Sequence, residues 1–518
     1  STVAVFLGGM GRRYLAVKTD AQFGAHRAIH FYLLSVCIGS LIPKMSAHTT
    51  RAAPTSTQGW RREPTWQALQ GQATWDVCVV GGGATGLGIA LDAAARGYSV
   101  VLAEAEDFAS GASSRSSKML HGGVRYLQQM DFALVKEALA ERATVLANAP
   151  HVAQVLPFVI PCESLAHAAF YGSGLKLYDL LAGSRNVGRS HYISSKAMGA
   201  QVGALKAHAH GIQYHDGLFD DARLAQSIAR SARERGAVLM NYCRAEIKGQ
   251  ADDGADLILL SRKDTGAQHT LRARCTIVAT GAWSGERVAV SRGSHIVLKD
   301  IGLASGVLLP KTPDGRVLYL LPWLGHTLIG TTDVSVSRPD YGHQAPQDDI
   351  AWLLKTASQV LQKPLEAHQV TASFVGYRPL VNRSQTGKNS SQLSRAHLVE
   401  RLSARSLRVV GGKWTTYRRM AQDALDAAIA HGMLPKAMPC STAQLRLSPN
   451  PVLDNAWLTQ GQWSEDQLQK IVQSAVQEEA ACHAEDILYR RLRTGFTDQA
   501  LAQALQPQVA RSMKMMSG

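Results

Sequence analysis

Three features that mark other classes of protein are missing from this sequence of 518 residues. No apolar stretch reaches the ~18–20 residues that a membrane-spanning helix needs. None of the seven scattered cysteines forms a C-x-x-C pair, so we expect neither a structural zinc site nor a disulfide framework. Internal repeats are also absent. With 46% hydrophobic and 18% charged residues, the chain is expected to be globular and to work in a reducing compartment.

Long runs of one charge are missing as well, although the net charge is +15. Eight Lys and Arg residues face two acids before Trp75, which accounts for +6, and the remaining +9 contains no run of five like charges. Such dispersion argues against a nucleic-acid partner. Two explanations for the excess of positive charge remain open: binding of an anionic substrate and binding of an anionic lipid.

The first 74 residues are predicted to form an N-terminal extension. Residues 29–42 are apolar and follow four basic residues, and three interpretations remain open for them. They belong to a mitochondrial-type leader, to a membrane-surface anchor, or to sequence upstream of a true start at Met45. Residues 46–74 are rich in Ser, Thr, Ala and Gln and are predicted to be a linker.

A strand, a glycine-rich turn, a helix and a second strand are predicted between residues 75 and 104. Gly81, Gly83 and Gly86 form a G-x-G-x-x-G pattern in the turn, and Glu104 ends the second strand. Glycines let the backbone approach a pyrophosphate, the helix start offers free N–H groups, and the acid accepts from a ribose hydroxyl. The pattern therefore predicts a dinucleotide site.

Two later strands also end in small-residue turns, at Gly281 and at Gly411-Gly412, and a helix follows the second turn. A nicotinamide domain needs one such turn, whereas a flavin that lies across a protein needs a second helix end near its ring. The positive end of that helix would stabilise negative charge on the reduced ring. The pattern favours a flavin, with an ordinary strand-to-helix turn as the alternative. Further helices are predicted at 131–149, 221–236, 414–430 and 464–505, and strands are predicted between about 237 and 330.

Residues 113–127 carry two pairs of serines, His121, paired glycines and Arg125 directly after the dinucleotide unit. With the turn at 81–88, this stretch resembles the FAD-dependent glycerol-3-phosphate dehydrogenase family, within the D-amino-acid-oxidase-like flavoproteins. The similarity covers roughly residues 75 to 495. Its other motifs follow in the same order, at 219–224, 293–297, 329–333, 376–380, 411–418 and 485–491.

The resemblance implies an α/β fold. A Rossmann-like FAD-binding domain would be interleaved with a mixed or antiparallel-sheet substrate domain within residues 75–440. A small C-terminal helical domain would occupy residues 441–518, after the N-terminal extension 1–74.

The resemblance also implies an activity, the oxidation of sn-glycerol 3-phosphate to dihydroxyacetone phosphate, with hydride transfer to FAD and electrons passed to a quinone. Arg125, Arg378 and Lys413 would bind the substrate beside His121, and Arg378 and Lys413 would also stabilise the developing alkoxide. His295 is the candidate base, with His121 as the alternative. The implied cofactor-binding residues are Gly81, Gly83, Gly86, Glu104, Ser117, Gly281, Gly412, Lys413, Thr415 and Thr416.

The family is attached peripherally to membranes, which implies the cytoplasmic face of a bacterial inner membrane or, as the alternative, the mitochondrial inner membrane. A homodimer is also compatible with the resemblance. Arg490, Arg491 and Arg493 would either meet phospholipid or form a solvated helix face. Two rival functions remain: an oxygen-using glycerol-3-phosphate oxidase or related flavin oxidase, and a flavoprotein directed to RNA.

Overall fold

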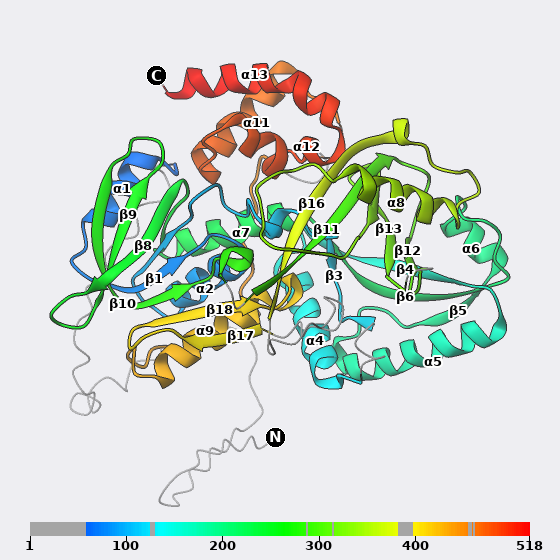
Figure 1. Ribbon diagram of the computed structural model, residues 1–518, viewed down its shortest axis with the longest axis horizontal. Helices are drawn as coiled ribbons and strands as arrows, with labels where there is room; N and C mark the ends of the chain where they lie inside the picture. Colours follow the sequence, from blue (N-terminus) through cyan, green and yellow to red (C-terminus); the bar gives the residue numbers. More distant parts are fainter. Residues whose placement is uncertain are drawn as a thin grey trace, which may run out of the picture. The chain divides into compact units, whose positions relative to one another are not determined.

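The computed structural model describes residues 59–124, 130–285, 288–312, 315–381, 397–453, 458 and 461–517. These residues form two large sheets with helices on both faces of each, and a helical region near the C-terminus (Figure 1). The chain passes repeatedly between the two sheets, as the interleaved arrangement predicts.

The first sheet has the order β17-β18-β10-β1-β2-β7, and the β8–β9 hairpin extends from β10. Strands β18, β10, β1, β2 and β7 run parallel, which is the arrangement of a doubly wound dinucleotide-binding sheet. Its strands are β1 (Trp75–Val80), β2 (Val100–Ala103), β7 (Val238–Met240), β8 (Cys243–Gln250), β9 (Asp256–Arg262), β10 (Gln268–Val278), β17 (His397–Arg401) and β18 (Ser406–Gly411).

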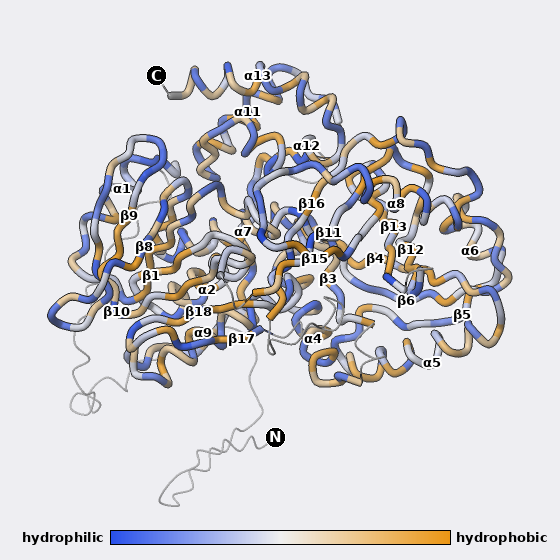
Figure 2. The backbone as a smooth tube through the Cα atoms, viewed as in Figure 1, coloured by the Kyte–Doolittle hydropathy of each residue, from blue (hydrophilic) through white to orange (hydrophobic). Residues whose placement is uncertain are grey.

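The parallel strands of this sheet are apolar on both sides, so both faces are covered. Helices cover one of the two faces. They are α2 (Ala84–Ala95), α7 (Asp221–Glu234) and α9 (Tyr417–Ala430), and they share one buried core with inward residues such as Val77, Val79 and Leu102. The other face packs against the β8–β9 hairpin and a short helix, α1 (Arg62–Gln70), through Trp66 and Leu69. Figure 2 shows the apolar residues concentrated in the strands and the inner helix faces.

The second sheet is mixed, with the order β15-β11-β14-β13-β12-β4-β6-β3; β16 also pairs with β11, and β5 with β6. The pairing of β12 with β4 is parallel and the other pairings are antiparallel. Its strands are β3 (Met119–Leu120), β4 (Ala153–Cys162), β5 (His191–Ser194), β6 (His210–Phe219), β11 (Val288–Lys299), β12 (Gly306–Leu309), β13 (Leu318–Trp323), β14 (His326–Gly330), β15 (Val334–Val336) and β16 (Val370–Val381).

Alternating residues of this sheet build two separate cores. Phe158 and Ile160 point to the side covered by α4 (Phe132–Asn148) and α5 (Leu165–Ala182), whereas Val159 points to the side of α6 (Ser195–Gln201) and α8 (Gln347–Ser358). Side-chain caps start the two longer helices: Leu134 N donates to Asp131 Oδ1, and His167 N donates to Ser164 Oγ.

Residues 461–517, in the C-terminal region, are mainly helical and share a small core with Leu453 and Leu458. Their helices are α11 (Glu465–Glu479), the π-helix η8 (Asp486–Arg491), α12 (Thr494–Thr497) and α13 (Gln499–Ser517). These elements lie beside α7 and β16 (Figure 1).

One element differs from the expectation for the N-terminal part. Residues 62–70 form α1 within the segment that composition predicts to be a linker, and its Trp66 and Leu69 are buried against the first sheet. Two buried apolar side chains about one helical turn apart are enough to dock a short helix, and composition alone does not reveal them. The other expectations for the N-terminal extension, including Met45, lie outside the described residues.

Candidate active site

The first glycine-rich turn joins β1 to α2 and leaves no room for side chains. Gly81 has φ +109°, a conformation that favours glycine. A Cβ on Gly86 would lie 1.8 Å from the Gly81 carbonyl oxygen, and a Cβ on Gly82 would lie 2.8 Å from Glu104 Cβ. Glycine is therefore needed for the turn itself to pack, as in the close strand–helix packing of a dinucleotide-binding turn.

Glu104 lies beside this turn, where the sequence predicts a ribose-binding acid. Its Oε2 accepts from Gly82 N at 2.6 Å and its Oε1 accepts from Glu106 N at 2.9 Å. Burial raises the pKa of Glu104 from its ordinary value, and the two N–H donors oppose that shift. Ser113 Oγ accepts from Ala84 N at the start of α2, at 2.9 Å. The turn and Glu104 thus fit the pyrophosphate and ribose of FAD, which they would hold.

The second turn, between β18 and α9, has the predicted strand, Gly-Gly, helix pattern. Gly411 and Gly412 have φ +76° and +75°. A Cβ on Gly412 would lie 2.4 Å from Met420 Sδ, so this position also requires glycine. The 3₁₀ helix η6 (Trp414–Thr416) follows and leads into α9.

Helices α2 and α9 pack closely together at Gly88. A Cβ on this residue would lie only 2.9 Å from the Tyr417 ring, so glycine permits the close approach. Both helices begin at one cavity, which Thr85 and Thr415 line. The start of α2 and the second glycine turn therefore open on a shared space, as a flavin that reaches both helix starts would require.

This cavity has a volume of about 420 Å³ and reaches from the starts of α2 and α9 to the second sheet. Seven of the predicted site residues line it: Ser117, His121, His295, Arg378, Gly412, Lys413 and Thr415. Among the described residues, the predicted cofactor residues Gly81, Gly83, Gly86, Glu104, Gly281 and Thr416 do not belong to its lining. Arg125 lies outside the described residues.

His295 lies in the middle of β11, paired with Gly330 of β14 and Phe374 of β16. Its ring is 2% exposed and stacks on Phe374, with centroids 4.7 Å apart and an interplanar angle of 14°. Its Nε2 lies 2.8 Å from Ser117 Oγ. Burial lowers the pKa of His295 well below its ordinary value, and the charges of Arg378 and Lys118 lower it further. The imidazole is therefore neutral near pH 7, as a proton acceptor must be.

The side chain of Arg378, on β16, packs against Gly293 and lines the same cavity. A Cβ on Gly293 would lie 2.2 Å from Arg378 Nη2, so only glycine leaves space for the guanidinium. Arg378 Nη2 donates to Thr331 Oγ1 at 2.8 Å, and Nη1 donates to Thr332 O at 3.2 Å. These contacts orient the guanidinium at the cavity wall.

His121 reaches the cavity from the loop after β3, and its backbone N–H donates to Thr415 Oγ1 at 3.2 Å. Lys413 precedes η6 at the second turn, where Thr416 N donates to its carbonyl oxygen at 3.0 Å. The loop that carries His121 is thus tied to the turn that carries Lys413.

A buried charge cluster behind the cavity was not predicted. Lys118 Nζ donates to both carboxylate oxygens of Asp221, at 2.7 and 2.9 Å, and to Ser114 O at 2.8 Å. Arg493 Nη2 donates to the same carboxylate at 2.8 Å. Burial lowers the pKa of Lys118 to about 7, and Asp221 opposes that shift. Asp221 belongs to the motif at 219–224, but nothing in the motif indicates its partners.

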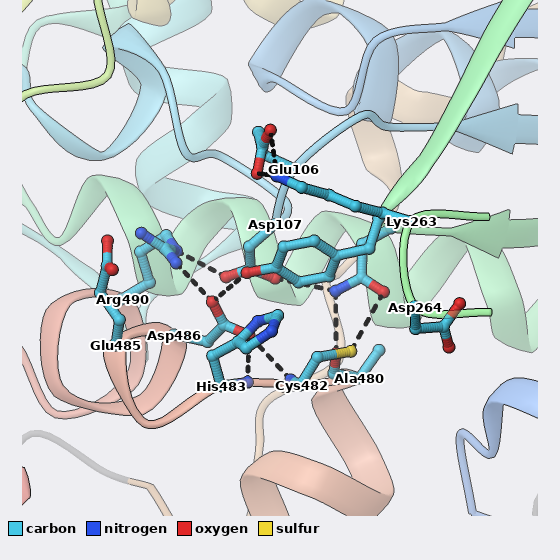
Figure 3. Close-up of polar contacts among 12 residues, drawn as sticks. Glu106, Asp107, Lys263, Asp264, Ala480, Cys482, His483, Glu485, Asp486 and Arg490 are labelled. Carbon is cyan, nitrogen blue, oxygen red and sulfur yellow. Dashed lines mark hydrogen bonds and ion pairs between the residues drawn. The ribbon is translucent and has the colours of Figure 1, made fainter. Parts of the chain in front are cut away.

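The C-terminal arginines correct a further expectation. Arg490, Arg491 and Arg493 are buried, so they form neither a solvated face nor a phospholipid contact. Figure 3 shows Arg490 between Asp107 and Asp486: its Nε donates to Asp107 Oδ2 at 2.5 Å and its Nη2 to Asp486 Oδ1 at 2.6 Å. Arg491 also pairs with Asp107. Asp107 and Asp221, which pair with these arginines, lie far away in sequence, and an isolated helix motif cannot indicate them.

Comparison with known proteins agrees with this geometry. The FAD dependent oxidoreductase family matches residues 76–415. A mitochondrial glycerol-3-phosphate dehydrogenase of Arabidopsis thaliana is 38% identical over 402 residues, which cover 72% of this chain and 63% of that protein. Glycerol-3-phosphate dehydrogenase 2 of Mycobacterium tuberculosis is 37% identical over 403 residues, which cover 73% of this chain and 68% of that protein.

Among solved structures, a glycerol-3-phosphate dehydrogenase from Bacillus halodurans, complexed with FAD, has the same fold. The TM-score is 0.68 and the sequences are 25% identical, over 88% of this chain and 93% of that chain. The matched part of this chain thus spans less than two thirds of the plant relative's own length, and nearly all of the bacterial structure.

Proposed function

Because the chain belongs to the FAD-dependent oxidoreductases and, within them, to the glycerol-3-phosphate dehydrogenases, we propose that it oxidises sn-glycerol 3-phosphate to dihydroxyacetone phosphate. One observation carries the proposal: a single cavity brings Arg378 and Lys413 to His295 between the two glycine turns. A phosphate dianion needs cations of this kind, and the guanidinium fork suits bidentate binding. Arg125 would add a third cation.

In this reaction FAD, when bound, supplies the acceptor for the hydride that leaves C2 of the substrate. Residues of the chain bind the phosphate, stabilise the developing charge and accept the proton. The cationic cluster holds the phosphate, and Arg378 and Lys413 also favour negative charge on the C2 oxygen as its proton leaves. His295 takes that proton, because its lowered pKa keeps the imidazole neutral. His121, in the same cavity lining, remains the alternative base.

The proposed substrate is tested by anaerobic addition of glycerol 3-phosphate to the purified holoenzyme. We expect the yellow flavin band to bleach, because hydride transfer reduces the ring. Glycerol lacks the phosphate, and D-alanine lacks both the phosphate and the C2 hydroxyl. Neither compound should bleach the band at equal concentration. Bleaching by D-alanine alone would instead assign an amino-acid oxidase.

The electron acceptor is proposed to be a quinone, with molecular oxygen as the alternative. Support for the quinone comes from the names of the relatives, which are dehydrogenases rather than oxidases. Stopped-flow reoxidation separates the two: the reduced holoenzyme is mixed with air-saturated buffer or with a soluble quinone analogue. Faster reoxidation by the quinone supports the proposal, and faster reoxidation by oxygen overturns it.

We also propose that the chain works on the surface of an anionic membrane, bacterial or mitochondrial. No helix in the described part of the chain is both long and apolar enough to cross a bilayer. The support is the outer face of α5, where Leu165, Phe170 and Leu180 are 66%, 61% and 75% exposed. An exposed apolar helix face of this kind is typical of helices that lie in the membrane interface.

The charges around α5 favour a lipid partner over a second copy of the chain. Residues 165–201 contain four Lys and Arg residues, Lys176, Arg185, Arg189 and Lys196, and one acid, Asp179. Asp179 is engaged by Ser190, whose N–H and hydroxyl both donate to it. A basic surface repels its own copy but attracts anionic headgroups.

Flotation of the holoenzyme with vesicles tests this surface. We expect binding to phosphatidylglycerol vesicles that is lost in the double variant Phe170→Ser/Leu180→Ser and retained in Ile247→Ser, an exposed position on β8. Glycerol-3-phosphate oxidation with a soluble dye should be unchanged, because these residues lie away from the cavity lining. Wild-type protein that stays off the vesicles would overturn the proposal, as would a dimer that the double variant disrupts.

A further inference from the structure

The ring nitrogen Nε2 of His295, which faces the loop at 114–118, is already in contact with a side chain. Nε2 lies 2.8 Å from Ser117 Oγ, and both residues line the cavity. The ring has little freedom to turn, since it stacks on Phe374 and a mere Cβ on Gly330 would lie 2.2 Å from His295 Cδ2. A ligand in the cavity therefore reaches Nε2 through the Ser117 hydroxyl or by displacing it.

Displacement of Ser117 is opposed by the residues on either side of it. Ser116 donates to Asp221 Oδ2 through its N–H at 2.9 Å and through its hydroxyl at 2.7 Å. On the other side, Lys118 Nζ holds the same carboxylate. The side chains of Lys118 and Asp221 are fully buried. One buried carboxylate thus holds the backbone N–H of Ser116 and the side chain of Lys118, on either side of Ser117, which keeps the Ser117 hydroxyl at His295.

The cluster is also held from the C-terminal region. Arg493 Nη2 donates to Asp221 Oδ1 at 2.8 Å and to Ser114 O at 3.1 Å, and Ser114 O accepts from Lys118 as well. Two cations and one carboxylate therefore hold both ends of the loop at 114–118. A hydroxyl held so firmly between a cavity and an imidazole is arranged for proton transfer rather than for packing.

We propose that Ser117 is a catalytic residue that relays a proton from the C2 hydroxyl of the substrate to His295. The O–H bond of the substrate breaks as its proton passes to Ser117 Oγ. The Ser117 proton passes to His295 Nε2, so the serine is regenerated and the imidazole gains one proton. The C2 hydride leaves with its electron pair to the flavin, the oxidant. This relay rests on the proposed function, and it replaces the cofactor-binding role that the sequence predicts for Ser117.

The test compares anaerobic flavin reduction by glycerol 3-phosphate in holoenzyme variants. We expect Ser117→Ala to lower the limiting reduction rate by about 10²-fold or more while the Kd for the substrate changes only a few-fold. Ser117→Thr keeps the hydroxyl and should recover most of the rate. Ser305→Ala is the matched control, since Ser305 is a buried serine whose hydroxyl donates to Gln201 at 2.8 Å and which does not line the cavity.

Two further readouts separate a relay from a structural role. Rates in mixtures of H₂O and D₂O should give a curved proton inventory for the wild type, with two protons in flight, and a linear one for Ser117→Ala. In the oxidised holoenzyme without substrate, ¹⁵N NMR should show His295 in the Nδ1–H tautomer, which Ser117→Ala weakens. Unchanged reduction in Ser117→Ala, equal losses in the Ala and Thr variants, or loss of FAD from Ser117→Ala would each overturn the relay. Failure of the wild type to bleach would instead overturn the proposed function.

Discussion

The neutrality of one buried histidine is the most consequential property at the residue scale. His295 is nearly inaccessible to water and lies near two cations, Arg378 and Lys118, and both conditions disfavour the charged ring. Nothing in the motif at 293–297 indicates that environment. The sequence identified the residue because histidine suits proton transfer, but burial and its cationic neighbours arise from β11, β16 and the loop at 114–118 coming together.

The pH dependence of flavin reduction follows from this environment. Because the pKa of His295 lies well below its ordinary value, the neutral base persists as the pH falls through about 6.5. We expect the limiting rate of reduction at saturating glycerol 3-phosphate to stay level from about pH 8 to about pH 6 and to decline only below that. Stopped-flow absorbance measures it. A midpoint near 6.5 would contradict a buried neutral base.

Arg378 provides a second prediction at this scale, on phosphate binding. Arg378→Lys keeps the charge but loses the fork that Thr331 and Thr332 orient. We expect the Kd for glycerol 3-phosphate to rise by about 10–100-fold, since a charge-assisted hydrogen bond contributes about 1.5–3 kcal/mol. Anaerobic titration of the flavin spectrum measures the affinity. Arg274→Lys, an exposed position on β10, is the control, and an unchanged Kd in Arg378→Lys would remove Arg378 from the phosphate site.

At the scale of elements, the strand–turn–helix units were the part most open to prediction. Their signals are local: a short apolar run, glycines at fixed spacing and a helix within about 30 residues. The helices predicted at 131–149 and 221–236 are confirmed as α4 and α7, and the 409–430 pattern as β18, η6 and α9. Helix α1 was missed because its polar composition hides two buried side chains, Trp66 and Leu69.

The tight packing of the first glycine turn predicts that a substitution there weakens cofactor retention. In Gly86→Ala the new methyl group would meet the Gly81 carbonyl oxygen at 1.8 Å, so the turn must shift. We expect a lower Tm and less flavin per chain in the purified protein, measured by thermal unfolding and by the ratio of flavin to protein absorbance. Gly174→Ala, on α5 with open space around it, is the control and should be neutral or slightly stabilising. Full flavin content in Gly86→Ala would contradict the close packing of this turn.

The whole molecule depends on contacts between segments that are far apart in sequence. Asp107 follows the first dinucleotide unit, yet its partner Arg490 lies near the C-terminus (Figure 3), as does its second partner, Arg491. Sequence reasoning treated these arginines as surface residues because charge usually marks a solvated helix face. Only the fold shows that the C-terminal region supplies counter-charges to the loops around the cofactor turn. The division of the chain at residue 440 stays a prediction.

Removing one partner of this buried network should be costly. Asp107→Asn leaves Arg490 and Arg491 with less compensation in a region that excludes water, and we expect a loss of about 3–5 kcal/mol in the free energy of unfolding. Chemical denaturation of the holoenzyme measures it. The control is Glu246→Gln, which breaks an exposed pair with Arg244 and should have little effect. Equal stability of the two variants would mean that the C-terminal region is not anchored through Asp107.

The most direct measurement of the central claim is a crystal structure of this chain with FAD and glycerol 3-phosphate bound. We predict that the flavin spans both glycine turns, that the phosphate contacts Arg378 and Lys413, and that the C2 hydroxyl lies within hydrogen-bond distance of Ser117 or His295. A phosphate bound away from both cations, or a flavin that contacts only one of the two turns, would contradict the account.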